Sequence, residues 1–442
     1  MKLNKYLLMA AMGLGLIACT ENDLVEGSDS NGAQNEGTTY VAYSLDFKKA
    51  GTKAVTTEEG TASEQGITSA YVILADGDII KEVVSSDDCE EGTGANVSKD
   101  YYLFETTEGT HQFYAVVNPD IVPTTEMTIT QYFQAGVDLT VTNITAANNF
   151  MMSSCAVKEV YVADGVTKEE ALAGAMDQEG TNNISINVER VSAKVTMTCG
   201  SETLDNAVGG DADSNPNYGG KISDLMFNLK GVASKAYRMA VSPWADIPYN
   251  TWIDGAGNVE VTVGDIYSNA IPAYCLENLH SAGGYTQDNT TYITLHTIFI
   301  PKKVLKHTEA GWSLEDYNGD AVTFYVVKSS TEEGLAGNYI LDSDWTNYKN
   351  EEFAEGITVS APYENGECWF GPIWIGQEAD QPQQGPVYRN TWYNLAITSI
   401  KLPGEPNEPE PDDGKPLVPG TNVAVTLSVM PWNFINREIG LQ

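Results

Sequence analysis

Apolar and polar positions alternate with a period of two in two stretches near opposite ends of the chain. In residues 39–47 (TYVAYSLDF), one face carries Val41, Tyr43, Leu45 and Phe47. In residues 421–434 (TNVAVTLSVMPWNF), the equivalent face carries Val423, Val425, Leu427 and Val429. A period of two is the pattern of a β-strand with one buried face, so both stretches are predicted to be strands.

Short runs of the same kind, separated by turn residues, occupy much of the chain between them. The runs with strand patterns are 69–74, 79–84, 111–117, 222–229, 259–263, 291–300, 322–327, 369–375 and 392–400. Residues 184–197 form a longer run whose phase changes at Arg190, as at a β-bulge. The clearest helix, 167–176, starts with a capping box of Thr167 and Glu170. Many short strands and few short helices predict two β-sandwich domains.

The alternation breaks once near the middle of the chain, at residues 243–249 (PWADIPY). We therefore place a domain boundary near residue 245, with an N-terminal sandwich over 38–245 and a C-terminal sandwich over 246–400. Residues 401–420 are rich in Pro, Gly and acidic residues, which predicts an extended, solvated spacer. The strand in 421–442 follows this spacer, so it is expected to pair far from the domain before it.

The first 19 residues have the pattern of a secretory signal. Two lysines precede an apolar run, which ends in Leu16-Ile17-Ala18-Cys19. This ending resembles the site at which bacterial lipoprotein signal peptidase leaves a diacylated cysteine as the new N-terminus. Residues 20–37 are small and polar, and we expect them to form a tether between lipid on Cys19 and the first folded strand.

The charge balance excludes some classes of partner. Asp and Glu total 61 against 24 Lys and Arg, for a formal charge of -37, which argues against nucleic acid and against attraction to anionic lipid. Residues 316–320 (DYNGD) look like a calcium loop, but the Gly comes too early and no Glu stands at the twelfth position, so a turn is favoured. The four histidines occupy no catalytic signature. Neither an enzyme nor a cofactor or metal site is predicted.

Several stretches together resemble a known family. They are the lipobox at Cys19, residues 113–118 (FYAVVN), 187–195 (NVERVSAKV) and 387–400 (VYRNTWYNLAITSI), and a final strand containing Met430-Pro431-Trp432. In order and spacing they resemble the fimbrillins, the type V pilins of Bacteroidetes, and specifically the subunit family of the minor fimbrium. The resemblance implies two transthyretin-like β-sandwich domains with few short helices, in a pilus subunit that reaches the cell surface as an outer-membrane lipoprotein.

The resemblance also implies a route of assembly. In the family a trypsin-like protease cuts after a basic residue, the N-terminal strand leaves, and the C-terminal strand of another subunit fills the vacated groove. Carried over, the removed strand contains Val41, Tyr43, Leu45 and Phe47. The donor strand contains Val423, Val425, Leu427, Val429 and Trp432. Its partners would be copies of this chain or other fimbrial subunits.

The cut itself departs from the family pattern. Family members commonly carry Arg there, whereas this chain offers only lysines. Lys53 before Ala54 fits best by position, and Lys49 is the alternative. A protease that accepts only arginine would not process this chain.

A different class of function remains open, namely a monomeric surface lipoprotein or a tip adhesin that binds glycans on a host or bacterial surface. Trp369, Trp374 and Trp392 could form a sugar-binding platform, but they lie in strand-like runs, which favours core packing. Trp432 is expected to anchor in a neighbour's pocket, with an intramolecular contact as the alternative. The presence of a donor strand and the lack of an extra N-terminal domain favour a shaft subunit, or an accessory subunit that polymerises in the same way.

Overall fold

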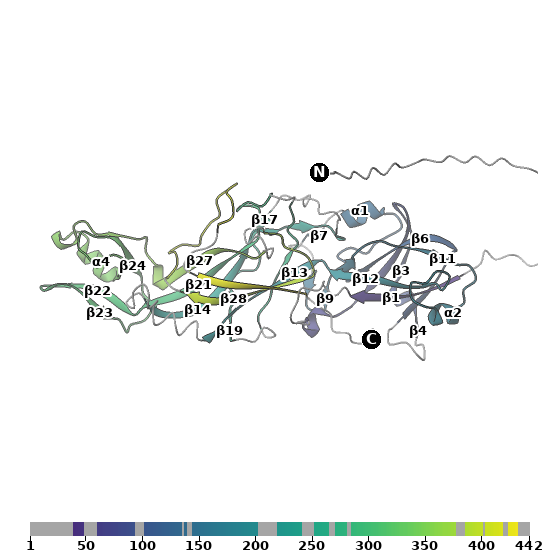
Figure 1. The fold of residues 1–442 in the computed structure, drawn as a ribbon, viewed down its shortest axis with the longest axis horizontal. Coiled ribbons are helices and arrows are strands. Elements are labelled where there is room, and N and C mark those ends of the chain that lie inside the picture. The colour runs from purple at the N-terminus through teal and green to yellow at the C-terminus, as the bar shows by residue number, and fades with distance from the viewer. Residues whose placement is uncertain are drawn as a thin grey trace, which may run out of the picture.

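The computed structural model describes residues 39–47, 60–92, 101–134, 137–138, 144–201, 219–240, 252–264, 270–280, 284–376, 385–400, 403–418 and 423–431. Strands dominate these residues, and the α-helices among them are Ile129–Gln134 (α1), Lys168–Ala173 (α2) and Asp342–Tyr348 (α4). The molecule is elongated, with the N-terminal strands toward one end (Figure 1). The predicted fold class, mainly β-sandwich with few short helices, is confirmed.

The first sheet has nine strands in the order β3-β2-β6-β10-β12-β1-β5-β4, with β11 paired to β6. Their bounds are Thr39–Phe47 (β1), Ala70–Asp76 (β2), Ile79–Ser85 (β3), Glu90–Gly92 (β4), Tyr101–Thr106 (β5), Gly109–Val117 (β6), Met152–Ser154 (β10), Lys158–Val162 (β11) and Asn183–Arg190 (β12). Inward side chains such as Val72, Phe113 and Ile184 form its core. The alternation of apolar positions thus becomes the inner face of one sandwich.

The second sandwich is made of two sheets. The second sheet has the order β19-β13-β28-β29 with β20 beside β13, and the third sheet has the order β18-β14-β21-β27. The bounds are Ser192–Cys199 (β13), Gly220–Lys230 (β14), Val259–Glu260 (β18), Thr262–Val263 (β19), Ala273–Leu276 (β20), Tyr292–Pro301 (β21), Glu367–Trp374 (β27), Thr391–Ile400 (β28) and Val423–Pro431 (β29). Side chains from both sheets, including Val195, Phe227 and Leu395, form one buried core between them.

The phase change at Arg190 marks the passage from one sandwich to the other. β12 ends at Arg190 in the first sheet, and β13 begins at Ser192 in the second. The expected boundary near residue 245 lies outside the described residues, and sheet membership changes at Val191 instead. Alternation along the chain does not tell which partner a strand has, so the sequence pattern suggested a bulge within one strand.

The remaining strands are short. At the end of the molecule far from β1 lie Lys303–Thr308 (β22), Gly311–Asp316 (β23), Phe324–Ser329 (β24), Tyr339–Leu341 (β25) and Thr358–Val359 (β26) (Figure 1). Two-residue strands are Val137–Asp138 (β7), Thr145–Ala146 (β8), Asn149–Phe150 (β9), Val232–Ala233 (β15), Lys235–Ala236 (β16) and Trp252–Ile253 (β17). The far-end hairpin β22–β23 was not predicted from the sequence.

Buried ion pairs join the two sandwiches. Arg389, just before β28, donates to Glu277 and to the carbonyl oxygen of Arg238. Arg238 in turn donates to Asp120, with 2.8 Å between Nε and Oδ1. Trp392 of β28 belongs to the core of the first sandwich. The two sandwiches therefore share apolar and ionic contacts.

The described residues contain no helix long and apolar enough to span a membrane. Within the same part of the chain, no three His, Cys, Asp or Glu side chains are grouped so that they could hold a metal ion.

Candidate functional site

The predicted removable strand, β1, lies inside the first sheet rather than at its edge. It runs parallel to β12, from Ala42 opposite Asn183 to Phe47 opposite Val188. On its other side it runs antiparallel to β5, from Thr39 opposite Thr106 to Tyr43 opposite Tyr102. If β1 left, both neighbours would lose a ladder of backbone hydrogen bonds.

Both faces of β1 are buried, whereas the sequence predicted one. Val41 and Tyr43 have no exposed surface and belong to the core of the first sandwich, with Leu45 packed beside them. The Tyr43 ring stacks on Tyr102, with 5.3 Å between ring centroids. On the opposite face, Ala42 packs in a second buried cluster with Leu103 and with Ala171 of α2. Helix α2 therefore covers the face that was expected to be solvated.

Polar contacts fix the start of β1. The hydroxyl of Thr39 donates to the carbonyl oxygen of Ala163 at 2.6 Å. The side-chain amide of Asn182 donates to Thr39 Oγ1 at 3.1 Å and to the carbonyl oxygen of Tyr40 at 3.0 Å. Asn182 is buried and has a φ of 50°, a backbone conformation that asparagine tolerates better than most residues. Asn182 thus sets where the strand begins.

The candidate cleavage positions Lys49, Lys53 and Ala54 lie between the end of β1 and Gly60, outside the described residues. Beyond them the chain is anchored through Glu64. Its carboxylate lies 2.9 Å from Lys194 Nζ and accepts a hydrogen bond from Tyr274 at 2.7 Å. The guanidinium of Arg190 donates to the Glu64 carbonyl oxygen at 3.2 Å.

Electrostatics keep Glu64 ionised. Burial alone would raise the pKa of its carboxyl, but attraction to Lys194 and hydrogen bonds from Lys194, Tyr274 and Thr61 outweigh burial and lower it. Both side chains of the ion pair are almost completely buried. The chain that follows the candidate cut is therefore held to β13 independently of β1.

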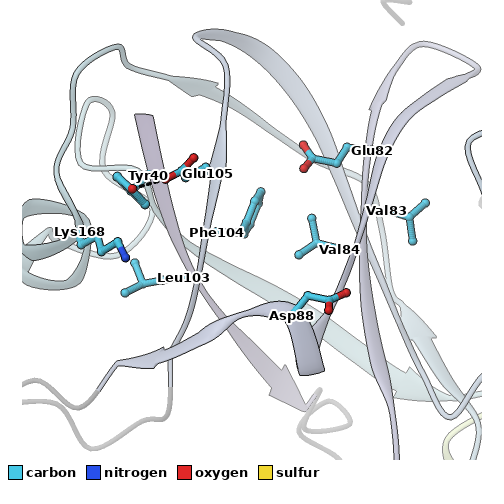
Figure 2. Close-up of a pocket in the computed structure, with 9 residues that line it drawn as sticks. All are labelled: Tyr40, Glu82, Val83, Val84, Asp88, Leu103, Phe104, Glu105 and Lys168. Carbon is cyan, nitrogen blue, oxygen red and sulfur yellow. Dashed lines mark hydrogen bonds between the residues drawn. The ribbon is translucent and has the colours of Figure 1, made fainter. Parts of the chain in front are cut away.

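A cavity of about 400 Å³ lies beside β1 (Figure 2). Its lining residues come from β1, β3, β5, α2 and the turn after β3: Tyr40, Glu82, Val83, Val84, Asp88, Leu103, Phe104, Glu105 and Lys168. Figure 2 shows Glu82 and Val84 on β3 facing Phe104 across the cavity. Burial raises the pKa of the Glu82 carboxyl, an effect that its hydrogen bond from Thr106 opposes.

Tyr40 lines this cavity and lies on β1, the strand predicted to be removed. Its hydroxyl donates to Glu105, and Lys168 Nζ lies 5.1 Å from the centre of its ring. Departure of β1 would therefore remove one wall of the cavity.

The predicted donor strand, β29, lies at the edge of the second sheet. It pairs antiparallel to β28, from Thr391 opposite Pro431 to Ile400 opposite Val423. Among the described residues it has no strand on its other side. β1 and β29 have the same length, nine residues. For Val423, Val425, Leu427 and Val429 the structure describes the backbone only, and Trp432 lies outside the described residues.

The Pro-rich segment before β29 is bound to the third sheet instead of being a free spacer. The backbones of Glu405 and Trp369 exchange hydrogen bonds of 2.7 and 2.8 Å. The Glu408 carboxylate accepts a hydrogen bond from Asn228 at 3.0 Å. Leu417 is buried against Trp374, whose indole N–H donates to the carbonyl oxygen of Val418 at 2.6 Å. Residues 403–418 are named the strap below.

The other predicted residues are distributed as follows. Trp374 and Trp392 are buried and Trp369 is half-buried, so these three rings do not form an open platform. Cys19 lies outside the described residues. The sequence analysis missed Glu64 and Asn182, because single polar residues in polar stretches carry no spacing signal, and their partners are distant in sequence.

Comparisons with known proteins were made for the whole chain. Residues 361–438, which include β27, β28, the strap and β29, match the family model described as major fimbrial subunit protein type IV, fimbrillin, C-terminal. No curated protein matches the sequence.

Solved structures that match this chain include a fimbrilin (fimA) from Porphyromonas gingivalis, with 14% identity over 91% of this chain and 99% of that one and a TM-score of 0.49. A putative cell adhesion protein from Parabacteroides distasonis has 14% identity, the same two coverages and a TM-score of 0.46. The tip fimbrial protein Mfa3 from P. gingivalis has 13% identity, coverages of 89% and 100%, and a TM-score of 0.40. Residues 361–438 are therefore similar to the C-terminal region of the fimbrillins, the major fimbrial subunit proteins.

Proposed function

We propose that this protein is a structural subunit of a surface fimbria that is activated by loss of β1 and polymerises by exchange of β29. One observation carries the proposal. An interior strand, β1, is followed directly by a lysine-bearing segment, and an edge strand of equal length ends the described chain. The family match over residues 361–438 supports the fimbrial role.

The arrangement of backbone ladders favours exchange after a cut. An empty groove between β12 and β5 would leave two rows of backbone N–H and C=O groups without partners, together with an open strip of core. Among the strands that the structure describes, β29 has one neighbour on its own molecule, whereas in the groove of another subunit it would have two. Insertion therefore adds a ladder, in the manner of β-strand addition.

Burial of side chains adds to this gain. Val423, Val425, Leu427 and Val429 stand at alternate positions, as do Val41, Tyr43 and Leu45. Full burial of four such side chains contributes roughly 6 to 12 kcal/mol before ordering costs. Each subunit gives one strand and receives one, and a head-to-tail contact that does not close produces a filament.

The anchoring of Glu64 separates the released part from the retained part. A cut after Lys53, or after Lys49, detaches β1 covalently from the rest of the chain, while the ion pair with Lys194 holds the part that follows. In this scheme the precursor carries lipid on Cys19, is attached to the outer membrane at the cell surface, and stays monomeric because β1 fills the groove. Similarity to minor-fimbrium subunits in particular stays a prediction.

The test uses the lipid-free chain starting at Glu21, treated lightly with trypsin and run unheated in SDS while the new N-terminus is sequenced. We expect a ladder of SDS-resistant oligomers only after a cut between Lys48 and Lys53. Deletion of residues 421–442 should abolish the ladder without affecting the cut. The triple variant Lys48→Gln/Lys49→Gln/Lys53→Gln removes every lysine of this window and is the matched control that should resist activation.

Two outcomes would overturn the proposal. One is a chain that is cut at the expected position, loses β1 and stays monomeric. The other is a ladder that persists after residues 421–442 are deleted. A monomer that binds glycans would instead favour the surface lipoprotein or tip adhesin.

A further inference from the structure

The strap, residues 403–418, crosses the outer face of the third sheet. The core-facing positions of β14 and β21 are occupied by Phe227, Leu229, Ile293 and Leu295. The intervening residues Asn228 and Thr294 point to the opposite face, because side chains alternate along a strand. Glu408 is within hydrogen-bond distance of both, at 3.0 Å from Asn228 and 2.5 Å from Thr294.

A charge contact and several backbone contacts add to this attachment. Lys230 Nζ lies 3.4 Å from Glu408 Oε2. Further along, the backbone N–H groups of Asp412 and Gly414 donate to the side chains of Gln287 and Asp288 at 3.0 and 2.8 Å. Attachment is thus spread along the strap instead of being concentrated at one residue.

The last attachment is at Val418, whose carbonyl oxygen accepts from the Trp374 indole. Leu417 beside it is buried against Trp374 and Tyr292. Beyond Val418 the next described residue is Val423, the first residue of β29, which belongs to the other sheet of the sandwich. None of the strap contacts named above involves β29.

We propose that the strap stays bound to the third sheet whether or not β29 is docked on β28, so that Val418 is the fixed point from which the donor strand moves. This inference rests on the proposed strand exchange. Glu408 and Trp374 act as positioning residues for the exchange, because they hold the strap and do not touch the acceptor groove.

The fixed point limits the reach of the donor strand. Val423 is five residues after Val418, and an extended chain covers at most about 3.3 to 3.6 Å per residue, so β29 can begin no more than roughly 18 Å from Val418. If the chain were free from Ile400 onward, the same residue could lie roughly 80 Å from that strand end. A bound strap therefore restricts where the next subunit can sit.

Hydrogen exchange on the uncut monomer tests the attachment of the strap. The reporters are the backbone amides of Glu405, Asp412 and Gly414. They donate hydrogen bonds to the Trp369 carbonyl oxygen and to the side chains of Gln287 and Asp288, respectively. We expect them to be protected, and to remain so when residues 421–442 are deleted. Loss of protection on this deletion would show that the strap depends on β29, which overturns the proposal whether or not the protein polymerises.

Two variants test the positioning residues. Glu408→Ala should speed exchange of the strap amides about tenfold, as expected when charge-assisted bonds holding a segment are lost. Its matched control is Glu410→Ala, at an exposed neighbouring position. Trp374→Phe removes the hydrogen bond to the Val418 carbonyl oxygen and keeps an aromatic ring against Leu417. Trp312→Phe is its control, since the Trp312 indole N–H has no hydrogen-bond partner among the described residues.

The filament supplies a second measurement. In electron micrographs of filaments, Glu408→Ala and Trp374→Phe should at least double the width of the distribution of angles between neighbouring subunits, while the controls match the wild type. An unchanged distribution would overturn the positioning role. If the wild-type protein forms no filaments, the proposed polymerisation by strand exchange is wrong. The hydrogen-exchange data on the monomer still decide whether Val418 is a fixed point.

Discussion

Glu64 and Lys194 form a buried ion pair, 2.9 Å apart, that ties the chain just after the candidate cleavage segment to the second sandwich. Lys194 Nζ also lies 4.1 Å from the centre of the Trp392 ring, on the strand next to it. The pair therefore sits where the two sandwiches share their contacts. Loss of the Glu64 carboxylate would leave the charged ammonium group of Lys194 in a buried site.

We expect Glu64→Gln to lower the free energy of unfolding by about 3 to 5 kcal/mol, because it leaves Lys194 buried without its counter-charge. Urea denaturation followed by tryptophan fluorescence measures this change. The control is Asp254→Asn, which breaks a surface pair with Lys230 and should cost no more than about 1 kcal/mol. Equal effects of the two substitutions would contradict the role given to Glu64.

Acid should destabilise the protein through two carboxyls. The pKa of Glu64 is lowered in the folded state, as is that of Glu408, where burial is outweighed by hydrogen bonds from Thr294 and Asn228 and by Lys230. A lowered folded-state pKa stabilises the fold above the unfolded value, about 4.3 for glutamate, and this contribution is lost as the pH falls through the folded value.

The urea midpoint should therefore be level near pH 7 and fall below about pH 5. Glu64→Gln should flatten part of this fall, because the substituted side chain no longer titrates. A variant that keeps the full wild-type pH dependence would show that the Glu64 pKa is not lowered by folding.

We expect Tyr43→Ala to weaken the hold on β1 by about 3 to 5 kcal/mol, the usual cost of truncating a buried aromatic residue. After the cut, β1 should then leave faster, and the oligomer ladder should appear sooner than with the wild type. Tyr40→Phe is the control, because it keeps the ring and removes only the hydrogen bond to Glu105. A ladder that forms no faster with Tyr43→Ala would mean that release of β1 does not limit assembly.

Buried cysteines should be unreactive in the folded protein. Burial raises the pKa of the Cys199 thiol to about 11 and that of Cys275 to about 12, and the thiolate is the reactive form. At pH 8 a thiol reagent should label both at least a hundredfold faster in denaturant than in buffer, measured by mass spectrometry of peptides. Rapid labelling of Cys275 in buffer would contradict its placement in the core.

Elements whose cause lies in neighbouring residues, such as β1 and the start of α2, were predicted from the sequence. β1 covers the predicted residues 39–47, and the capping box is present, with Thr167 N–H donating to Glu170 at 2.9 Å and Glu170 N–H donating to Thr167 at 3.2 Å. A strand with a buried face and a capping box are both determined by residues close together in sequence, so an alternation of apolar residues or a pair of residues three apart is enough to predict them.

Features that depend on distant partners could not be predicted in the same way. The composition of residues 401–420 indicates that they cannot form a core of their own, so the sequence predicted an extended, solvated spacer. It does not show that Glu408 and Leu417 both find partners on β21, more than a hundred residues earlier. The position of β1 between β12 and β5 is likewise set by pairing across the whole domain.

The passage from β12 to β13 has a mechanical consequence. β12 lines the groove that holds β1, and after Val191 the same backbone continues as β13, which pairs with β28, the neighbour of β29. In a filament under tension, force from a received strand would pass along this one covalent run to the sheet beside the donated strand. Stretching the filament would then load strand ladders in shear, and the side-chain contacts between the two sandwiches would carry less of the force.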